Sequence, residues 1–389
     1  MDRLLRNFAL ICVVFGLVGC SSVGYFWQAA AGHVSIMAQS RDIEEVLADP
    51  ESPPWLVDQL VQVRKIRDYS VSELSLPDNR SYRMYSDIER KFPVWNVVAA
   101  PDDSLTLNTW CFPIVGCIAY KGFYAEEDAL ELAQELRDEG LDVAVSGVPA
   151  YSTLGFTADP ILSSFVTYPP GELARLIFHE LSHQVVYIEN DTQFNESFAT
   201  AVEQLGVQAW LGQVGHETLK QDYERFNDRR EGFRRLLLEA KSELAAAYEN
   251  EGFSREEKLS AKRVILEKLK VRYEQMKMSQ WEGWGGYDAY FVTDLNNAKL
   301  ALVGVYNQYV PAFKVLFARC GANFPKFYES VRALGKLPAS ERVAMLNLLE
   351  NREPLPYALG CDQGMYVPPD GPDTSKEQIS NIQGTNPAL

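Results

Sequence analysis

Apolar residues recur at helical spacing over two long parts of the chain. From residue 25 to 76 they lie three or four positions apart, and Pro53-Pro54 interrupts the pattern. From 217 to 278 two further apolar stripes flank a polar turn. We therefore expect a helical N-terminal segment and, further along, a long helical hairpin.

Between these regions the pattern changes from the helical period to that of strands. Apolar runs at 94–100, 117–120 and 141–148 indicate strands, and an amphipathic run at 125–139 ends at a glycine. Strands and a helix joined by short turns are typical of a small mixed α/β layer. A helical pattern resumes at 296–316.

The whole pattern predicts a predominantly helical α+β protein. After Cys361 the chain is rich in Pro, Gly, Asp, Ser and Asn, which indicates a disordered tail. We expect four parts: a signal peptide at 1–19, a helical segment at 20–80, a main domain at 81–361 that includes the hairpin 217–278, and a tail at 362–389.

The first twenty residues have the layout of a secretory signal. Arg3 and Arg6 precede an apolar run at 8–17 that is too short to span a bilayer as a stable anchor. The run ends in Leu-Val-Gly-Cys, which resembles the bacterial lipobox, so Cys20 would be the lipidated N-terminus. Ser21 replaces the Asp that retains such proteins in the inner membrane. The resemblance implies an outer-membrane lipoprotein facing the periplasm; an uncleaved anchor is the alternative.

Charge and cysteine content narrow the classes further. The formal net charge of −16 argues against a nucleic-acid partner, which needs a basic surface. After Cys20, four cysteines remain, and an even number in an oxidising compartment indicates two disulfides. Of three connectivities we prefer Cys111–Cys117 with Cys320–Cys361; four free buried thiols are the alternative.

The clearest chemical signal is His179-Glu180-Leu181-Ser182-His183. Pro169 and Pro170 mark the start of a helix that contains it. Two histidines four residues apart on a helix project from one face, so both could bind one tetrahedral zinc ion. Glu180 would lie near a water on that ion and act as general base. A hydrogen-bonded pair of core histidines is the alternative interpretation.

A catalytic zinc site usually has a third protein ligand, and no third histidine follows at short spacing. A turn-forming segment leads into a second expected helix at 195–210, which could present Glu196 to the metal. Glu203, seven residues on, is the rival ligand or a partner that supports a histidine. Thr200 and Asn195 are further candidates for support. Either glutamate could instead be a solvated helix carboxylate.

His-Glu-Leu-Ser-His-Gln followed by Asn-Glu-Ser-Phe-Ala resembles the gluzincin peptidases. The chain is more closely similar to a bacterial family described as putative aminopeptidases, many with lipoprotein signals. The resemblance covers about 25–361 and implies a zincin-like core, with His179, His183 and Glu196 as Zn²⁺ ligands and Glu180 as base. It rests on segments that include 95–101, 110–117, 150–155, 178–184, 194–200 and 296–300.

Two parts of the expected site stay open. Residues 147–155 are a candidate edge strand that pairs with an extended substrate, or an ordinary structural strand. A tyrosine or histidine usually stabilises the oxyanion. The candidates are Tyr151 and Tyr306, with His216, Tyr287 and Tyr290 behind them.

We therefore expect a zinc-dependent peptidase of aminopeptidase type that acts on peptides. An endopeptidase that acts on envelope proteins and a non-catalytic zinc-binding scaffold are the alternatives. The membrane partner would be reached through lipid on Cys20. The sequence does not predict the oligomeric state.

Overall fold

The computed structural model describes residues 25–361, apart from 26, 113–115, 151, 216, 294 and 305–307. The expected signal peptide, Cys20 and the tail at 362–389 lie outside the described residues, as do Tyr151, His216 and Tyr306. The chain divides into two compact units, Met1–Gln308 and Tyr309–Leu389. The expected main domain, 81–361, spans both of them.

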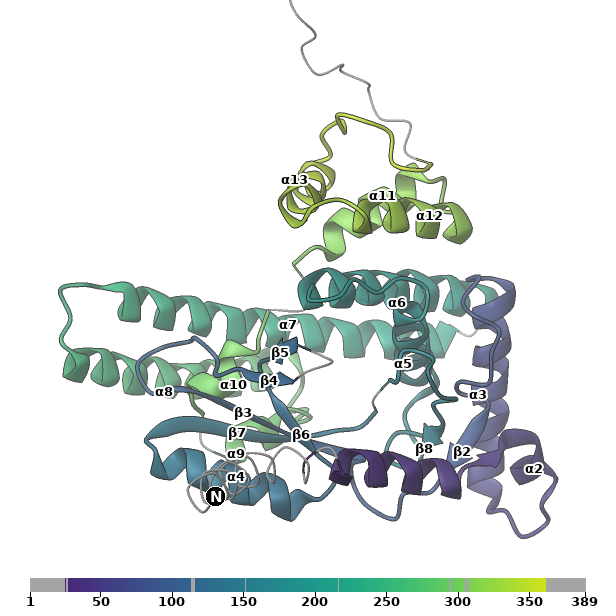
Figure 1. The fold of residues 1–389 in the computed structure, drawn as a ribbon, viewed down its shortest axis with the longest axis horizontal. Helices are drawn as coiled ribbons and strands as arrows, with labels where there is room; N and C mark the ends of the chain where they lie inside the picture. Colours follow the sequence, from purple (N-terminus) through teal and green to yellow (C-terminus); the bar gives the residue numbers. More distant parts are fainter. Residues whose placement is uncertain are drawn as a thin grey trace, which may run out of the picture. The chain divides into compact units, whose positions relative to one another are not determined.

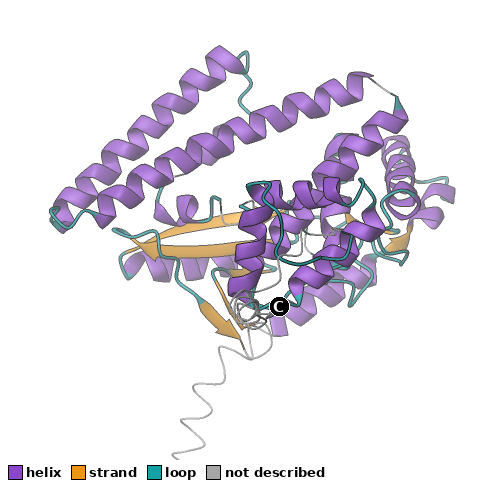
Figure 2. Ribbon diagram, turned by 90° about the horizontal axis from the view of Figure 1, so that it is seen from above, coloured by secondary structure: helices purple, strands orange, loops and turns teal. Residues whose placement is uncertain are grey.

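Helices dominate the described chain, and the strands form small sheets (Figure 2). This agrees with a predominantly helical α+β protein. At the N-terminal side, residues 27–39 are helical, and α2 (Ile43–Ala48) and α3 (Pro54–Ser72) follow. The break at the two prolines falls where the pattern predicted it, because Pro54 is the first residue of α3.

A short three-stranded sheet, which the pattern did not predict, joins this N-terminal region to residues 161–162. β1 (Arg41–Asp42) pairs with β2 (Met84–Ser86), and β2 pairs with β8 (Ile161–Leu162). Strands of two or three residues are too short to give an alternating pattern. Beside them the fully buried Arg67 of α3 donates hydrogen bonds to the backbone oxygens of Pro77 and Ser81.

The central sheet has the strand order β6-β3-β7 and is antiparallel throughout. β3 (Val94–Pro101) pairs with β7 (Leu141–Val148) along its whole length, while β6 (Lys121–Phe123) forms the other edge. α4 (Glu126–Asp138) packs on one face and α10 (Asn297–Ala301) on the other (Figure 1). The predicted α/β layer is confirmed.

One predicted strand of this layer was wrong in its extent. Residues 117–120 do not form a single strand: β5 (Gly116–Ile118) pairs with β4 (Trp110–Phe112), and the central sheet takes up β6 afterwards. The Cys111–Cys117 disulfide links β4 to β5, as expected. The disulfide and the β4–β5 pairing hold residues 116–118 in a separate hairpin.

Two helices carry the predicted chemical signal. α5 (Pro170–His183) begins at Pro170, as predicted, and buries Leu173, Ile177 and Phe178 along one side. α6 (Thr192–Val214) begins before residue 195, because the Asp191 side chain accepts a hydrogen bond from the Phe194 amide and caps the first turn. The two helices pack against each other.

The long helical hairpin is confirmed. α7 (Glu217–Glu249) and α8 (Arg255–Gln280) lie side by side in Figure 1. They share a buried apolar cluster that includes Phe233, Leu237 and Tyr273. The short helix α9 (Asp288–Val292) follows. Its neighbour Tyr287, together with Tyr290, packs on Phe233.

The helical pattern predicted at 296–316 corresponds to two helices rather than one. α10 ends at Ala301, and Gly304 adopts a positive φ of 85°, which ends right-handed helix geometry. α11 (Val310–Arg319) then begins the second unit, which also contains α12 (Phe324–Gly335) and α13 (Ala339–Glu350). The described helices include none with the length and apolar character needed to cross a membrane.

The second unit is closed by the Cys320–Cys361 disulfide, the other expected pairing. Its sequence separation of 41 predicts a stabilisation of about 4 kcal/mol from chain entropy, against about 2 kcal/mol for the separation of 6 at Cys111–Cys117.

Replacing both Cys320 and Cys361 by Ser should therefore lower the opening free energy of α11–α13 by about 4 kcal/mol. Hydrogen exchange with mass spectrometry is the suitable measurement, because the second unit contains no tryptophan. Exchange in α5 should not change. Equal protection of α11–α13 in the variant and the wild-type protein would contradict the prediction.

Candidate metal centre

Side chains from α5 and α6 converge beside the turn that joins the two helices. Nε2 of His179 lies 3.3 Å from Nε2 of His183 and 3.2 Å from a carboxylate oxygen of Glu196. The other oxygen of Glu196 lies 3.7 Å from Nε2 of His183. These three residues form the only group among the described residues whose ligand atoms could hold one metal ion.

The separations fit a zinc ion. A tetrahedral ion with ligands at about 2.0–2.1 Å holds neighbouring ligand atoms about 3.3 Å apart. The separation of the two histidine nitrogens, 3.3 Å, and that of His179 from Glu196, 3.2 Å, are close to this value, while His183 lies 3.7 Å from the other oxygen of Glu196. Two imidazole nitrogens and one carboxylate are also a donor set that zinc prefers at catalytic sites.

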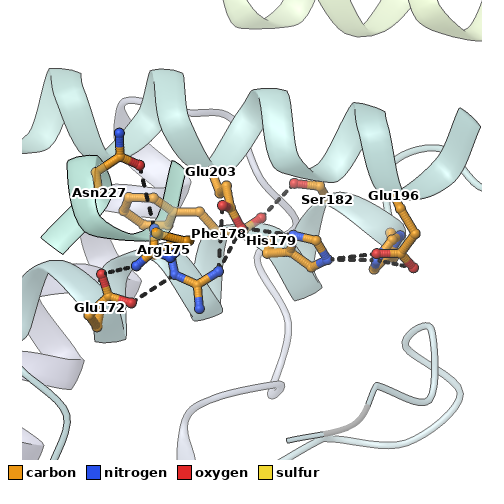
Figure 3. A network of polar contacts seen from close by, with 10 residues as sticks. Glu172, Arg175, Phe178, His179, Ser182, Glu196, Glu203 and Asn227 are labelled. Carbon is orange, nitrogen blue, oxygen red and sulfur yellow. Dashed lines mark hydrogen bonds and ion pairs between the residues drawn. The ribbon is translucent and has the colours of Figure 1, made fainter. Parts of the chain in front are cut away.

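Glu203 contacts the opposite nitrogen of His179. Its carboxylate lies 2.9 Å from Nδ1 and can accept a hydrogen bond from the ring, while Arg175 lies 3.2 Å from the same carboxylate (Figure 3). Arg175 is held in turn by Glu172, which also pairs with Arg230 of α7. Glu203 therefore orients His179, and Glu196 faces the shared point between the two histidines.

Positive charge is favoured on His179, which lies between the carboxylates of Glu196 and Glu203. Burial disfavours a charged imidazole, but hydrogen bonds to Glu196 and Glu203 outweigh it and raise the pKa of His179 to about 10. Burial and then the charge of His179 lower the pKa of His183 to about 4. Burial raises the pKa of both glutamates, but this effect is outweighed: Arg175 and His179 lower the pKa of Glu203, and the two histidines lower that of Glu196.

Glu180 faces the same cavity as the three converging residues. This cavity has a volume of about 540 Å³ and is lined by His179, Glu180, His183 and Glu196. Burial raises the pKa of Glu180 to about 7, opposed by the charge of His179 and supported by that of Glu196. Glu180 does not belong to the group of three residues whose ligand atoms converge, so its carboxylate is not needed to hold the ion.

A second cavity of about 520 Å³ adjoins the first. Both are lined by Glu196, Tyr120 and Tyr187. The two cavities therefore share a border that includes Glu196. An extended ligand could occupy both at once.

The remaining expected site residues lie in different places. Asn195 exchanges hydrogen bonds with the backbone of Ile188 and so fixes the turn between α5 and α6. Thr200 is buried on α6, one turn beyond Glu196. Tyr287 and Tyr290 pack in the hairpin cluster and line neither cavity.

Sequence reasoning missed the two described tyrosines that line both cavities. Tyr187 follows the end of α5 by four residues, and its ring lies 6.4 Å from that of His183, so its closeness to the motif in sequence could have identified it. Tyr120 immediately precedes β6, and only the tertiary fold brings it to Glu196. Burial, with the nearby Glu196 charge, raises the pKa of Tyr120.

Residues 147–155 divide into two parts. Gly147 and Val148 end β7 and pair with β3, whereas the described residues beyond are irregular. Asp159, which is buried, accepts hydrogen bonds from the backbone and hydroxyl of Thr153, and the amide of Leu154 donates to Ser152. These amides are therefore occupied by local contacts. The expectation of a continuous edge strand through this segment was wrong.

The fold and the site together define a mostly helical protein whose cleft contains an HExxH helix and a converging glutamate. Residues 24–346 match the model of the family described as "Putative aminopeptidase", and the chain belongs to this family. The family description points to a hydrolase that acts on peptides. A search of curated proteins and a search of solved structures each gave no significant match.

Proposed function

We propose that this protein is a zinc-dependent peptidase with His179, His183 and Glu196 as ligands and Glu180 as general base. The observation that carries the proposal is the set of ligand-atom separations, 3.2, 3.3 and 3.7 Å, in a cavity that also contains Glu180. The family supports peptides as the substrate class. A scaffold with structural zinc would not need a carboxylate at position 180.

The chain's own groups supply the remaining chemistry. Bound zinc would activate water and polarise the scissile carbonyl. Glu180 accepts the proton of the attacking water and returns it to the leaving amine. Glu203 accepts a hydrogen bond from Nδ1 of His179, which directs the lone pair of Nε2 towards the ligand point. Tyr120 and Tyr187 line the cleft near the reacting groups.

The family description favours an aminopeptidase. One observation favours the second candidate, an endopeptidase: two cavities of about 540 and 520 Å³ share Glu196 in their lining and together leave room for an extended chain. Peptides with free and with acetylated amino termini separate the two, because an aminopeptidase needs the free amine. Attachment through lipid on Cys20 at the outer membrane, facing the periplasm, belongs to the proposal and is supported by the sequence of the first twenty residues.

Removing the metal should abolish peptide cleavage. A chelator such as 1,10-phenanthroline is expected to inactivate the protein, because the proposed chemistry needs a cation between the imidazoles and Glu196. Stoichiometric zinc should restore activity, as measured on a peptide library. A non-chelating isomer of the inhibitor is the control. Full cleavage by protein shown to be free of metal would refute the zinc mechanism.

A further inference from the structure

The outer edge of β6 borders the cleft. On one side β6 pairs with β3, with Gly122 opposite Asn96. Tyr120, Gly122 and Tyr124 line the same cavity as His179 and Glu180. The backbone groups of Gly122 and Tyr124 that point away from β3 therefore lie at the border of the candidate site.

The N-terminal helix covers this edge. The Gln28 side chain donates to the Gly122 oxygen at 3.3 Å, and its own oxygen accepts from the Tyr124 amide at 3.0 Å. The Gly122 backbone also forms a hydrogen bond with the Tyr25 hydroxyl. Gly32 lies on the same helix face, where an added Cβ would lie within 2.2 Å of the Tyr124 ring.

These contacts imitate those of a peptide. An amide side chain offers one donor and one acceptor, as a peptide unit does. Gln28 uses both on the two groups through which a sheet edge accepts an added strand. The amides of Thr153 and Leu154 are already bonded locally, and of these two residues Leu154 lines the cavity. The edge of β6 is therefore the better candidate for strand addition.

The covering part of the helix has little buried surface. Besides its contacts with the edge, His33 lies 3.2 Å from the Thr157 hydroxyl, and the Tyr25 ring packs edge-on against Phe123. Among the described residues 25–35 none is buried, and Trp27 and Val34 are exposed. The first buried residue is Ile36, whose backbone oxygen accepts hydrogen bonds from Ser40 and Ser86. A segment with so little buried apolar surface costs little to displace. Ile36 would hold the remainder in place.

We propose that an extended peptide binds along the outer edge of β6, and that Tyr25 and Gln28 occupy this edge in the substrate-free protein. The N-terminal helix is then a displaceable cover of the substrate site. The inference rests on the proposed function for the identity of the ligand, a peptide. The cover itself rests only on the contacts of Tyr25, Gln28 and Gly32.

Gln28→Ala tests the cover, and Gln39→Ala is the matched control. Gln39 lies on the same helix, and its side chain contacts the exposed Ser35. In the Glu180→Gln background, Gln28→Ala should lower the Kd of a fluorescent extended peptide by up to about 30-fold, as expected from removing both hydrogen bonds that Gln28 makes in the covered state. Fluorescence anisotropy measures this, and Gln39→Ala should not change it.

Hydrogen exchange of the Tyr124 amide in the free protein gives a second measurement that needs no substrate. Exchange should be faster in Gln28→Ala than in Gln39→Ala. Unchanged exchange, or a peptide Kd equal or higher in Gln28→Ala, would overturn the inference. Zinc-dependent cleavage by the wild-type protein is measured in parallel. If it persists, only the cover is refuted; if cleavage and peptide binding are both absent, the proposed function fails as well.

Discussion

Glu180→Gln is expected to lower kcat/KM for peptide hydrolysis by about 10²–10⁴-fold, the usual contribution of general acid–base catalysis. The substitution preserves shape but removes the group that accepts the proton of the water. Glu180 lies outside the three-residue ligand group, so zinc content should stay at the wild-type level. Kinetics and metal analysis on the same preparation measure both quantities.

The matched control is Glu189→Gln. Glu189 is exposed in the turn between α5 and α6, so the same chemical change there should leave kcat/KM unaltered. Wild-type turnover by Glu180→Gln would remove Glu180 from the mechanism. Loss of zinc together with activity would instead assign Glu180 to metal binding, contrary to the geometry around Glu196.

Glu196→Gln should lose zinc more severely than Glu203→Gln. Glu196 faces both Nε2 atoms, whereas Glu203 contacts only Nδ1 of His179. Removing a charge that supports a histidine ligand typically costs about 10–100-fold in metal affinity. Glu203→Gln should show a loss of this size, and excess zinc should restore its activity. Glu196→Gln should exceed it and recover poorly.

Competition with a fluorescent zinc chelator measures both affinities. The two substitutions remove the same charge from the same helix, seven residues apart, so each controls for the other. Equal losses, or a larger loss in Glu203→Gln, would exchange the roles of the two glutamates. Circular dichroism establishes that α5 and α6 remain folded in both variants.

Long periodic segments could be predicted from the sequence, and short or interrupted ones could not. The hairpin α7–α8, β3 and β7 fall where the pattern placed them. The pattern at 296–316 continued through Gly304, because hydrophobic spacing carries no information on the sign of φ. The boundary at residue 308 between the two units has no compositional mark.

The same limit applies to the site. The convergence of His179, His183 and Glu196 follows from helix spacing and a short turn, so local sequence sufficed. Glu196 contacts Nε2 of His179 and Glu203 contacts Nδ1. The sequence could not establish this division, because both glutamates lie on one face of α6. Tyr120 and Gln28 reach the cleft from distant parts of the chain, and no local pattern marks them.

The close spacing of the three metal-binding candidates has a consequence for how the protein assembles. Positions 179 to 196 span only 18 residues, so an ion held there closes a short loop at small entropic cost. Contacts that are local in sequence form early. The α5–α6 pair is therefore expected to bind its ion without help from β3, β6 and β7, which contribute to the wall of the cleft. Damage to the sheet would then yield protein that is fully metallated yet unable to hold a peptide.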